Sequence, residues 1–235
     1  HTKGRFEPTC AMDITSDDLD QLVANIGRTM SSLTWVSRVF TVAQLAELKE
    51  KAILSKPSSI EYLSTMDALL SLWTKEICTK VRFSGDNPCP FPKIEVCFIV
   101  NNRLRFPELW EEGFVGNAFT GGYARYTPQE LSNKSPGELA AAVRSGINRV
   151  TKQMVVVEEQ WKGVRERGTY ECCQALWAWD DSNKGDTAGM IATDWTKFPI
   201  YETEFERAKP LTMDLDGEGT LIPWTTVMTK MADGS

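Results

Sequence analysis

The chain has 235 residues, of which 42% are hydrophobic and 25% are charged, proportions typical of a globular protein with a sizeable core. Its net charge is −6 and it has no run of basic residues, which argues against non-specific binding to nucleic acid. The sequence contains no run of about 18 apolar residues that would span a membrane, and no secretion leader opens it. We therefore expect a cytoplasmic protein.

The cysteine and histidine usage excludes several kinds of site. The six cysteines are irregularly spaced and form no C-x-x-C pair, so we expect buried thiols in a reducing compartment and no metal site. The only histidine is His1. A catalytic triad, a Cys-His pair or a histidine-ligated metal needs a histidine held by the fold, and a terminal residue is usually mobile. We expect no histidine-based catalytic centre in this chain.

The first part of the chain predicts a linker, a strand and a capped helix. Residues 1–30 are polar and irregular, as in a linker or crossover segment. Residues 33–40 (L-T-W-V-S-R-V-F) are β-branched and aromatic, which predicts a strand. Thr41 and Gln44 have the spacing of a capping box, and apolar residues recur at helical intervals over 42–52.

A second helix and an internal strand follow. Ser64 and Asp67 give another cap signal before the broad apolar face of residues 68–77. Residues 94–100 (I-E-V-C-F-I-V) are almost continuously apolar, which predicts a strand in the middle of a sheet, leading into N-N-R-L-R at 101–105.

The second half of the chain predicts further strands around a long helix. A strand is expected from residue 116 to 126, and S-P-G-E at 135–138 is the strongest helix start in the chain. Helical pattern continues, with possible breaks, to about residue 167. Strands are predicted at 189–197 and 221–230, and the final D-G at 233–234 is a hairpin signal. We expect either a fragment or a chain whose returning strand comes from elsewhere.

The stretch from residue 193 to residue 210, T-D-W-T-K-F-P-I-Y-E-T-E-F-E-R-A-K-P, carries the most information about function. It resembles the C-terminal signature of the BAHD acyltransferases, in which a strand with S/T-x-W precedes D-F-G-x-G-K/R-P. Glu204 stands at the aspartate position, and Phe205, Lys209 and Pro210 match. Residues 206–208 replace G-x-G, and Glu206 and Ala208 lack the conformational freedom of glycine.

The order of the other motifs, from residue 33 to residue 230, is also similar to the C-terminal half of that family, with fungal secondary-metabolite members looking closer than plant ones. The resemblance implies an α/β fold of the chloramphenicol-acetyltransferase type, a mixed β-sheet flanked by helices, over residues 31–235. It also implies acyl transfer from acyl-CoA to a hydroxyl or amine of a small molecule, with acyl-CoA as co-substrate and no tightly bound cofactor.

The resemblance assigns roles to two groups of binding residues. Ser64 and Thr65 match the helix start that faces the CoA channel, although a helix N-cap alone explains Ser64 equally well. Thr193 and Trp195 match positions that face the acceptor pocket, and strand alternation places both on one face; a core tryptophan is the simpler alternative. Asn117, in G-N-A-F, matches a residue beside the reaction tunnel, whereas its simpler role is that of a turn residue.

Two further implications concern residues that do not react. Arg103 matches an arginine that pairs with the signature carboxylate, here Glu204, and shapes the loop. The family's general base is the histidine of H-x-x-x-D, which lies in the N-terminal half and is not found in this sequence. We therefore expect the catalytic histidine to come from an N-terminal half, on the same or a separate polypeptide.

The sequence leaves three other hypotheses open. The chain could be a catalytically degenerate binding or scaffold module, since its D-F-G-x-G motif is altered. It could be a condensation-type domain, related in fold, that takes substrates from carrier proteins. A related scaffold recruited for a non-acyl reaction is a third alternative.

Overall fold

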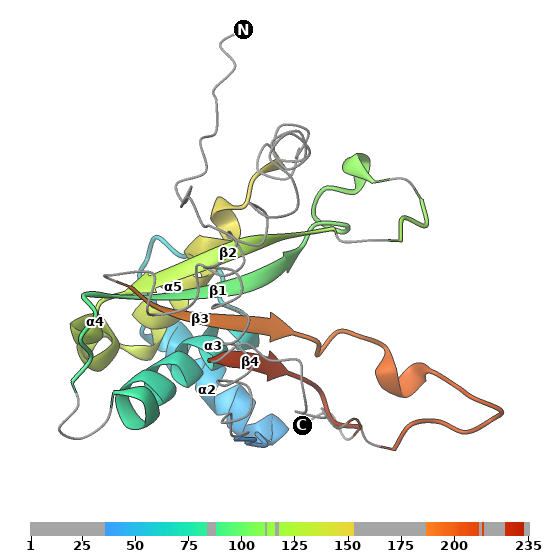
Figure 1. The fold of residues 1–235 in the computed structure, drawn as a ribbon, viewed down its shortest axis with the longest axis horizontal. Helices are drawn as coiled ribbons and strands as arrows, with labels where there is room; N and C mark the ends of the chain where they lie inside the picture. Colours follow the sequence, from blue (N-terminus) through green and yellow to red (C-terminus); the bar gives the residue numbers. More distant parts are fainter. Residues whose placement is uncertain are drawn as a thin grey trace, which may run out of the picture.

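The computed structural model describes residues 36–83, 88–110, 112–115, 118–152, 187–211, 213 and 224–232. Within them the chain forms a four-stranded mixed sheet in the order β2-β1-β3-β4. The helices lie together on one face of this sheet (Figure 1). The predicted fold class, a mixed sheet flanked by helices, is confirmed.

The four strands are β1 (Lys93–Asn101), β2 (Phe119–Tyr126), β3 (Thr187–Asp194) and β4 (Thr225–Met228). Strand β2 is antiparallel to β1, whereas β3 is parallel to both β1 and β4. The predicted internal strand at 94–100 is β1, which lies between β2 and β3. All four strands fall within or close to segments predicted as strands.

The helices are α2 (Val42–Leu54), α3 (Thr65–Glu76), α4 (Pro128–Asn133) and α5 (Pro136–Arg149). A π-helical segment, η1 (Ile77–Arg82), continues α3, and two short 3₁₀ turns, η2 (Pro107–Leu109) and η3 (Ile200–Glu202), lie in loops. Helix α5 ends at Arg149, where Val150 is extended. The sequence predicts that helical pattern continues to about residue 167. Most of this continuation, residues 153–167, is outside the described residues.

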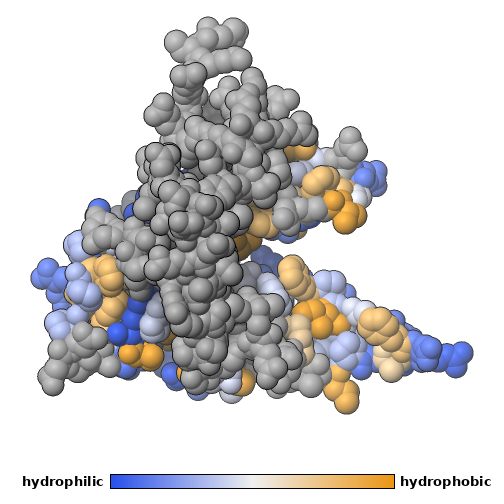
Figure 2. Space-filling model, viewed as in Figure 1, coloured by the Kyte–Doolittle hydropathy of each residue, from blue (hydrophilic) through white to orange (hydrophobic). Residues whose placement is uncertain are grey.

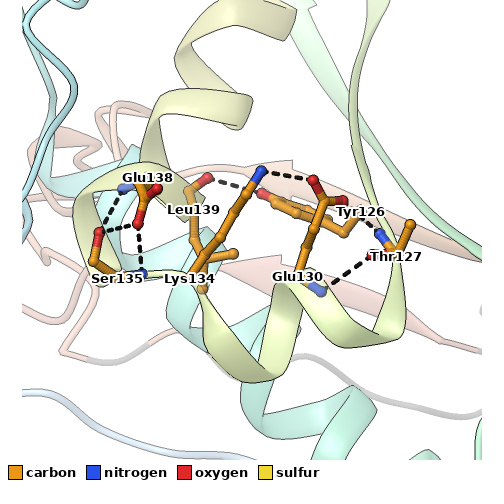
Figure 3. A network of polar contacts seen from close by, with 7 residues as sticks. All are labelled: Tyr126, Thr127, Glu130, Lys134, Ser135, Glu138 and Leu139. Carbon is orange, nitrogen blue, oxygen red and sulfur yellow. Dashed lines mark hydrogen bonds and ion pairs between the residues drawn. The ribbon is translucent and has the colours of Figure 1, made fainter.

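Local side-chain chemistry fixes the helix starts. All three predicted caps, led by Thr41, Ser64 and Ser135, are complete capping boxes. Figure 3 shows the last of these beside a fourth box that was not predicted, formed by Thr127 and Glu130 at the start of α4. The sequence T-P-Q-E repeats the S-P-G-E pattern of α5, so the same rule would have found it.

The core lies between the sheet and the helices. Along β1 the residues Ile94, Val96, Phe98 and Val100 are each at most 8% exposed, and the corresponding face of β3 is buried as well. Helix α5 covers this face, with the Tyr126 hydroxyl donating a hydrogen bond to the Leu139 carbonyl at 3.0 Å. Alternate residues of the strands therefore point away from the helices, toward the other face.

The predicted strand at 33–40 is wrong for its described part. Residues 36–40 form no strand, and the Val36 and Val39 side chains are 70% and 64% exposed. A strand needs a neighbour to satisfy its backbone groups, and the four described strands pair only with one another. Residues 33–35 lie outside the described residues, as do the expected linker at 1–30 and the hairpin signal at 233–234.

The E-F-E-R-A-K-P segment forms a two-residue hairpin turn. Phe205 and Ala208 exchange backbone hydrogen bonds of 2.9 and 2.8 Å. Between them Glu206 and Arg207 have φ angles of 50° and 73°, in the left-handed region that favours glycine. The turn therefore has a conformation that glycines would stabilise, without any glycine in it.

We predict that Gly137→Ala destabilises the protein by ~1–3 kcal/mol. Gly137 lies where α5 meets the end of α2, and a Cβ atom there would come within 2.3 Å of the Ala52 carbonyl oxygen and the Lys56 backbone nitrogen. Chemical denaturation measures the loss. Gln129→Ala changes the equivalent, exposed second position of α4 and is the matched control; equal effects of the two substitutions would contradict the prediction.

We also predict that Glu206→Gly with Arg207→Gly stabilises the 205–208 turn by about 1 kcal/mol, because side chains at positive φ are strained. Hydrogen exchange of the Phe205 and Ala208 amides should slow about fivefold on that basis. Ala208→Gly is the control, because Ala208 has no positive φ to relieve. Unchanged or faster exchange in the double variant would show that the turn is not strained.

Candidate functional site

The direction of α3 brings its N-terminus to the carboxyl ends of the parallel strands. The Trp73 indole N–H donates to Thr226 Oγ1 at 3.0 Å, and Thr226 pairs with Ala192 of β3. Further along, the Cys78 thiol donates to Met190 Sδ at 3.5 Å. The helix thus runs opposite to β3, and its first turn points toward the end of the sheet where β3 finishes. Ligands of open α/β sheets commonly bind at this end.

The predicted pair Thr193 and Trp195 lies at that end and on one face, as strand alternation required. The Trp195 indole N–H donates to Thr193 Oγ1 at 3.0 Å. The Trp195 backbone N–H donates to the Met228 carbonyl at 2.8 Å, and its ring stacks with Phe198 at a centroid distance of 6.0 Å. Because Thr193 Oγ1 accepts from the indole, the hydroxyl proton is left to donate elsewhere. No described residue receives it.

Ser64 is the N-cap of α3. Its Oγ accepts from the Asp67 N–H at 3.1 Å, and its own N–H donates to Asp67 Oδ2 at 2.6 Å. The buried Asp67 carboxylate also accepts from Arg144 Nε of α5 at 2.9 Å. Ser64 and its neighbour Thr65 remain half-buried. The capping role is confirmed, whereas contact of these two residues with CoA stays a prediction.

Two segments project beyond the carboxyl ends of the strands, one after β1 and one after β3 (Figure 1). Figure 2 shows a hollow between them, with hydrophobic side chains on both sides. The exposed hydrophobic residues of the first segment are Leu104, Phe114 and Val115, and those of the second are Phe198, Phe205 and Leu211. The hollow therefore has hydrophobic side chains on both of its sides.

Asn102 is not among the predicted site residues, but it anchors the first segment. It is fully buried; its N–H donates to the Ala118 carbonyl at 2.9 Å and its carbonyl accepts from the Phe106 N–H at 2.9 Å. Its side-chain amide donates to Thr120 Oγ1 at 2.7 Å. The polar residue directly after a buried strand was the signal that could have identified this anchor.

Arg103 and Glu204 lie in different segments. The Arg103 guanidinium lies over the Phe114 ring at 5.7 Å, and its backbone N–H donates to Asn101 Oδ1 at 3.0 Å. Glu204 is exposed in the segment after β3. The ion pairs found among the described side chains do not include one between Arg103 and Glu204. The pairing of these two residues stays a prediction. Asn117 lies outside the described residues, next to the buried Ala118.

The described part of the chain offers little reactive chemistry of its own. Burial raises the pKa of the Cys78 thiol to about 12, which makes it a poor nucleophile. Cys78, Cys89 and Cys97 form no disulfide. Nowhere in the described ranges do three histidine, cysteine or acidic side chains gather as a metal site would require. The helices described are also too short or too polar to cross a membrane.

Comparisons with known proteins identify a family and several structures with a similar fold. The model of the Transferase family matches residues 5–215. No curated protein matches the sequence significantly. Among solved structures, TRI101 of F. graminearum, complexed with coenzyme A and T-2 mycotoxin, is 22% identical with a TM-score of 0.57, over 81% of this chain and 41% of that one.

Two other structures have a similar fold. TRI101 of F. sporotrichioides, complexed with coenzyme A and T-2, is 21% identical with a TM-score of 0.57, over 94% of this chain and 53% of that one. Vinorine synthase is 16% identical with a TM-score of 0.55, over 83% and 40% of the two chains. The chain thus spans about half the length of these proteins or less. The family match covers most of its residues, and the chain belongs to the Transferase family, that of the BAHD acyltransferases.

Proposed function

We propose that this chain forms the CoA channel and one wall of the acceptor pocket of an acyltransferase. The reaction would move an acyl group from acyl-CoA to a hydroxyl or amine of a small secondary metabolite. One observation carries the proposal: the N-terminus of α3 and the pair Thr193 and Trp195 face the same end of the sheet, beside an apolar hollow. Similar structures bind coenzyme A together with T-2 mycotoxin, which supports this assignment.

The proposed chemistry needs a base from outside the described residues. A histidine of H-x-x-x-D, in an N-terminal half, would take the proton of the acceptor hydroxyl as its oxygen attacks the thioester carbonyl. The tetrahedral intermediate then collapses by breaking the carbon–sulfur bond, and the CoA thiolate takes the proton back from the histidine. Acyl-CoA is a co-substrate in this scheme and no tightly bound cofactor takes part. We place the reaction in the cytoplasm.

The described residues would bind and orient the substrates. The free backbone N–H groups at the start of α3 favour carbonyl or phosphate oxygens, so they suit the pantetheine arm or a phosphate of CoA. The Asp67–Arg144 ion pair holds that helix start against α5. The Thr193 hydroxyl, fixed by the Trp195 indole, would donate to an oxygen of the acceptor.

A binding module without acyl transfer is the second candidate. The observation that favours it is the turn at 205–208, where Glu206 and Arg207 hold left-handed backbone conformations without glycine. Relaxation of selection on catalysis would permit such strained replacements. An acyl-transfer assay of the full-length gene product distinguishes the two candidates. A binding module would bind CoA or the acceptor without forming product.

We predict that Thr65→Trp raises the KM for acyl-CoA about tenfold or more, because the indole would fill the space in front of the α3 N-terminus. Steady-state kinetics with acetyl-CoA measure this effect. Val42→Trp is the matched control, since Val42 is the first residue of α2 after an equivalent capping box and is 60% exposed. Equal KM values in the two variants would remove the α3 N-terminus from the CoA channel.

We predict that Thr193→Val lowers kcat/KM for the acceptor by ~10-fold while leaving the KM for acetyl-CoA unchanged, since it removes one hydrogen bond at nearly constant volume. Thr79→Val is the control, because Thr79 bonds only within its own helix. A normal acceptor kcat/KM in Thr193→Val would contradict the placement of the acceptor beside β3.

A further inference from the structure

The face of the sheet that points away from the helices carries a row of side chains beside Thr193. Phe98 of β1 pairs with Ala192 of β3, so the same register places Ile99 beside Thr193. On its other side Ile99 pairs with Gly121 of β2. Since Phe98 and Ala192 are buried under the helices, alternation turns Ile99 and Thr193 to the opposite face.

Ile99 is unusually open for its position. It lies on β1, an internal strand, yet its side chain is 37% exposed. The residues on either side of it in β1 face the helices and are at most 8% exposed. An exposed aliphatic side chain in the middle of a sheet, next to a hydroxyl whose proton has no described acceptor, suits a ligand that is apolar with one polar contact.

Tyr123 borders this surface. It pairs with Cys97, two residues before Ile99 on β1. Its ring leans over Gly121, where a Cβ atom would lie 2.9 Å from the Tyr123 hydroxyl and 3.3 Å from Cys97 Sγ. The Cys97 side chain hydrogen-bonds the Tyr123 side chain. The Arg125 guanidinium lies over the ring at 5.6 Å and pairs with Glu95 at 2.6 Å. The Tyr123 ring is therefore held in one place by its neighbours on β1 and β2.

The Tyr123 phenol does not change its protonation state near neutral pH. Burial, then the Cys97 side chain, then the Glu95 carboxylate raise the pKa of the Tyr123 phenol, while Arg125 lowers it. The shift is upward, so the phenol stays protonated across the neutral range.

We propose that Ile99 and Tyr123 determine which acceptors the enzyme takes, Ile99 as the apolar floor of the acceptor pocket and Tyr123 as its end wall. This inference rests on the proposed acyltransferase function and deepens it. The acceptor class that fits is an alcohol or amine with an apolar skeleton that lies on Ile99 and with an oxygen or nitrogen that accepts the Thr193 hydroxyl proton.

The test measures kcat/KM of acyl transfer for several acceptors. The enzyme is the full-length product of the gene. The probes are acetyl-CoA with isopentanol, cyclohexanol, borneol and a hydroxysteroid. Ile99→Trp raises the floor, so the ratio of kcat/KM for the hydroxysteroid to that for isopentanol should fall by at least about tenfold. Ile99→Ala lowers the floor, so the ratio should move in the opposite direction. Gly121→Ala pushes the Tyr123 hydroxyl aside and should also change the ratio.

Two controls separate an altered pocket from an altered fold. Leu54→Trp places the same indole at an exposed aliphatic position of α2, in the helix layer, and should leave the ratio unchanged. Binding of CoA, measured by calorimetry, should be the same in the wild type and in every Ile99 variant, because the α3 N-terminus is untouched.

The outcomes are distinct. If the wild type transfers acetyl groups but Ile99→Ala and Ile99→Trp keep its acceptor ratio, the inference is wrong and the proposed function stands. If another part of the protein covers Ile99, Ile99→Ala will lose stability without any change in the ratio, which overturns the inference in the same way. If the wild type acetylates none of the four alcohols, the proposed function fails and the inference fails with it.

Discussion

The arrangement of helices on the sheet depends on the buried carboxylate of Asp67. It caps α3 through the Ser64 backbone and receives Arg144 from α5, so one side chain fixes both the start of one helix and its contact with the next. Asp67 is fully buried and Arg144 is 18% exposed. A buried ion pair adds little net stability over apolar residues, but loss of either partner leaves an uncompensated charge that costs several kcal/mol. The pair therefore acts mainly on geometry: it sets where the N-terminus of α3 points, and with it the position of the proposed CoA channel.

The alternation of side chains along the strands divides the sheet into a structural face and an open face. Ile94, Val96, Phe98 and Val100 of β1 fill the core under the helices. The residues between them reach the other face, where continuing the register by one residue beyond Phe98 and Ala192 places Ile99 beside Thr193. Because the period of a strand is two, a shift of one residue in β1 would bury the polar side chains and expose the core. The burial of the core therefore also determines which side chains face the proposed acceptor pocket, and the two requirements are satisfied by the same register.

Features of the fold and of the site could be predicted where they depend on residues close together in the sequence, and not where they depend on residues far apart in it. Capping boxes involve residues three apart, so the starts of α2, α3 and α5 can be predicted from the sequence, and T-P-Q-E at 127–130 marks the start of α4 by the same rule. The strand expected at 33–40 was wrong in its described part because strand formation needs a distant partner that local sequence does not reveal. Ile99 and Tyr123 could not have been selected either: their neighbours Thr193 and Gly121 are defined by register across strands. The pairing of Thr193 with Trp195 was predictable, since it needs only alternation within one strand.

The turn at 205–208 bears on whether the altered signature still serves catalysis. Of the two positions at which the family motif has glycine, Glu206 has a positive φ angle and Ala208 does not; the second left-handed residue of the turn is Arg207. The Phe205–Ala208 hydrogen bonds close the turn. Strained backbone persists only where the surrounding structure determines it. The segment therefore forms a closed turn although residues other than glycine occupy it. The altered residues of the motif do not by themselves decide between an enzyme and a binding module, and that decision rests on the histidine that the reaction requires.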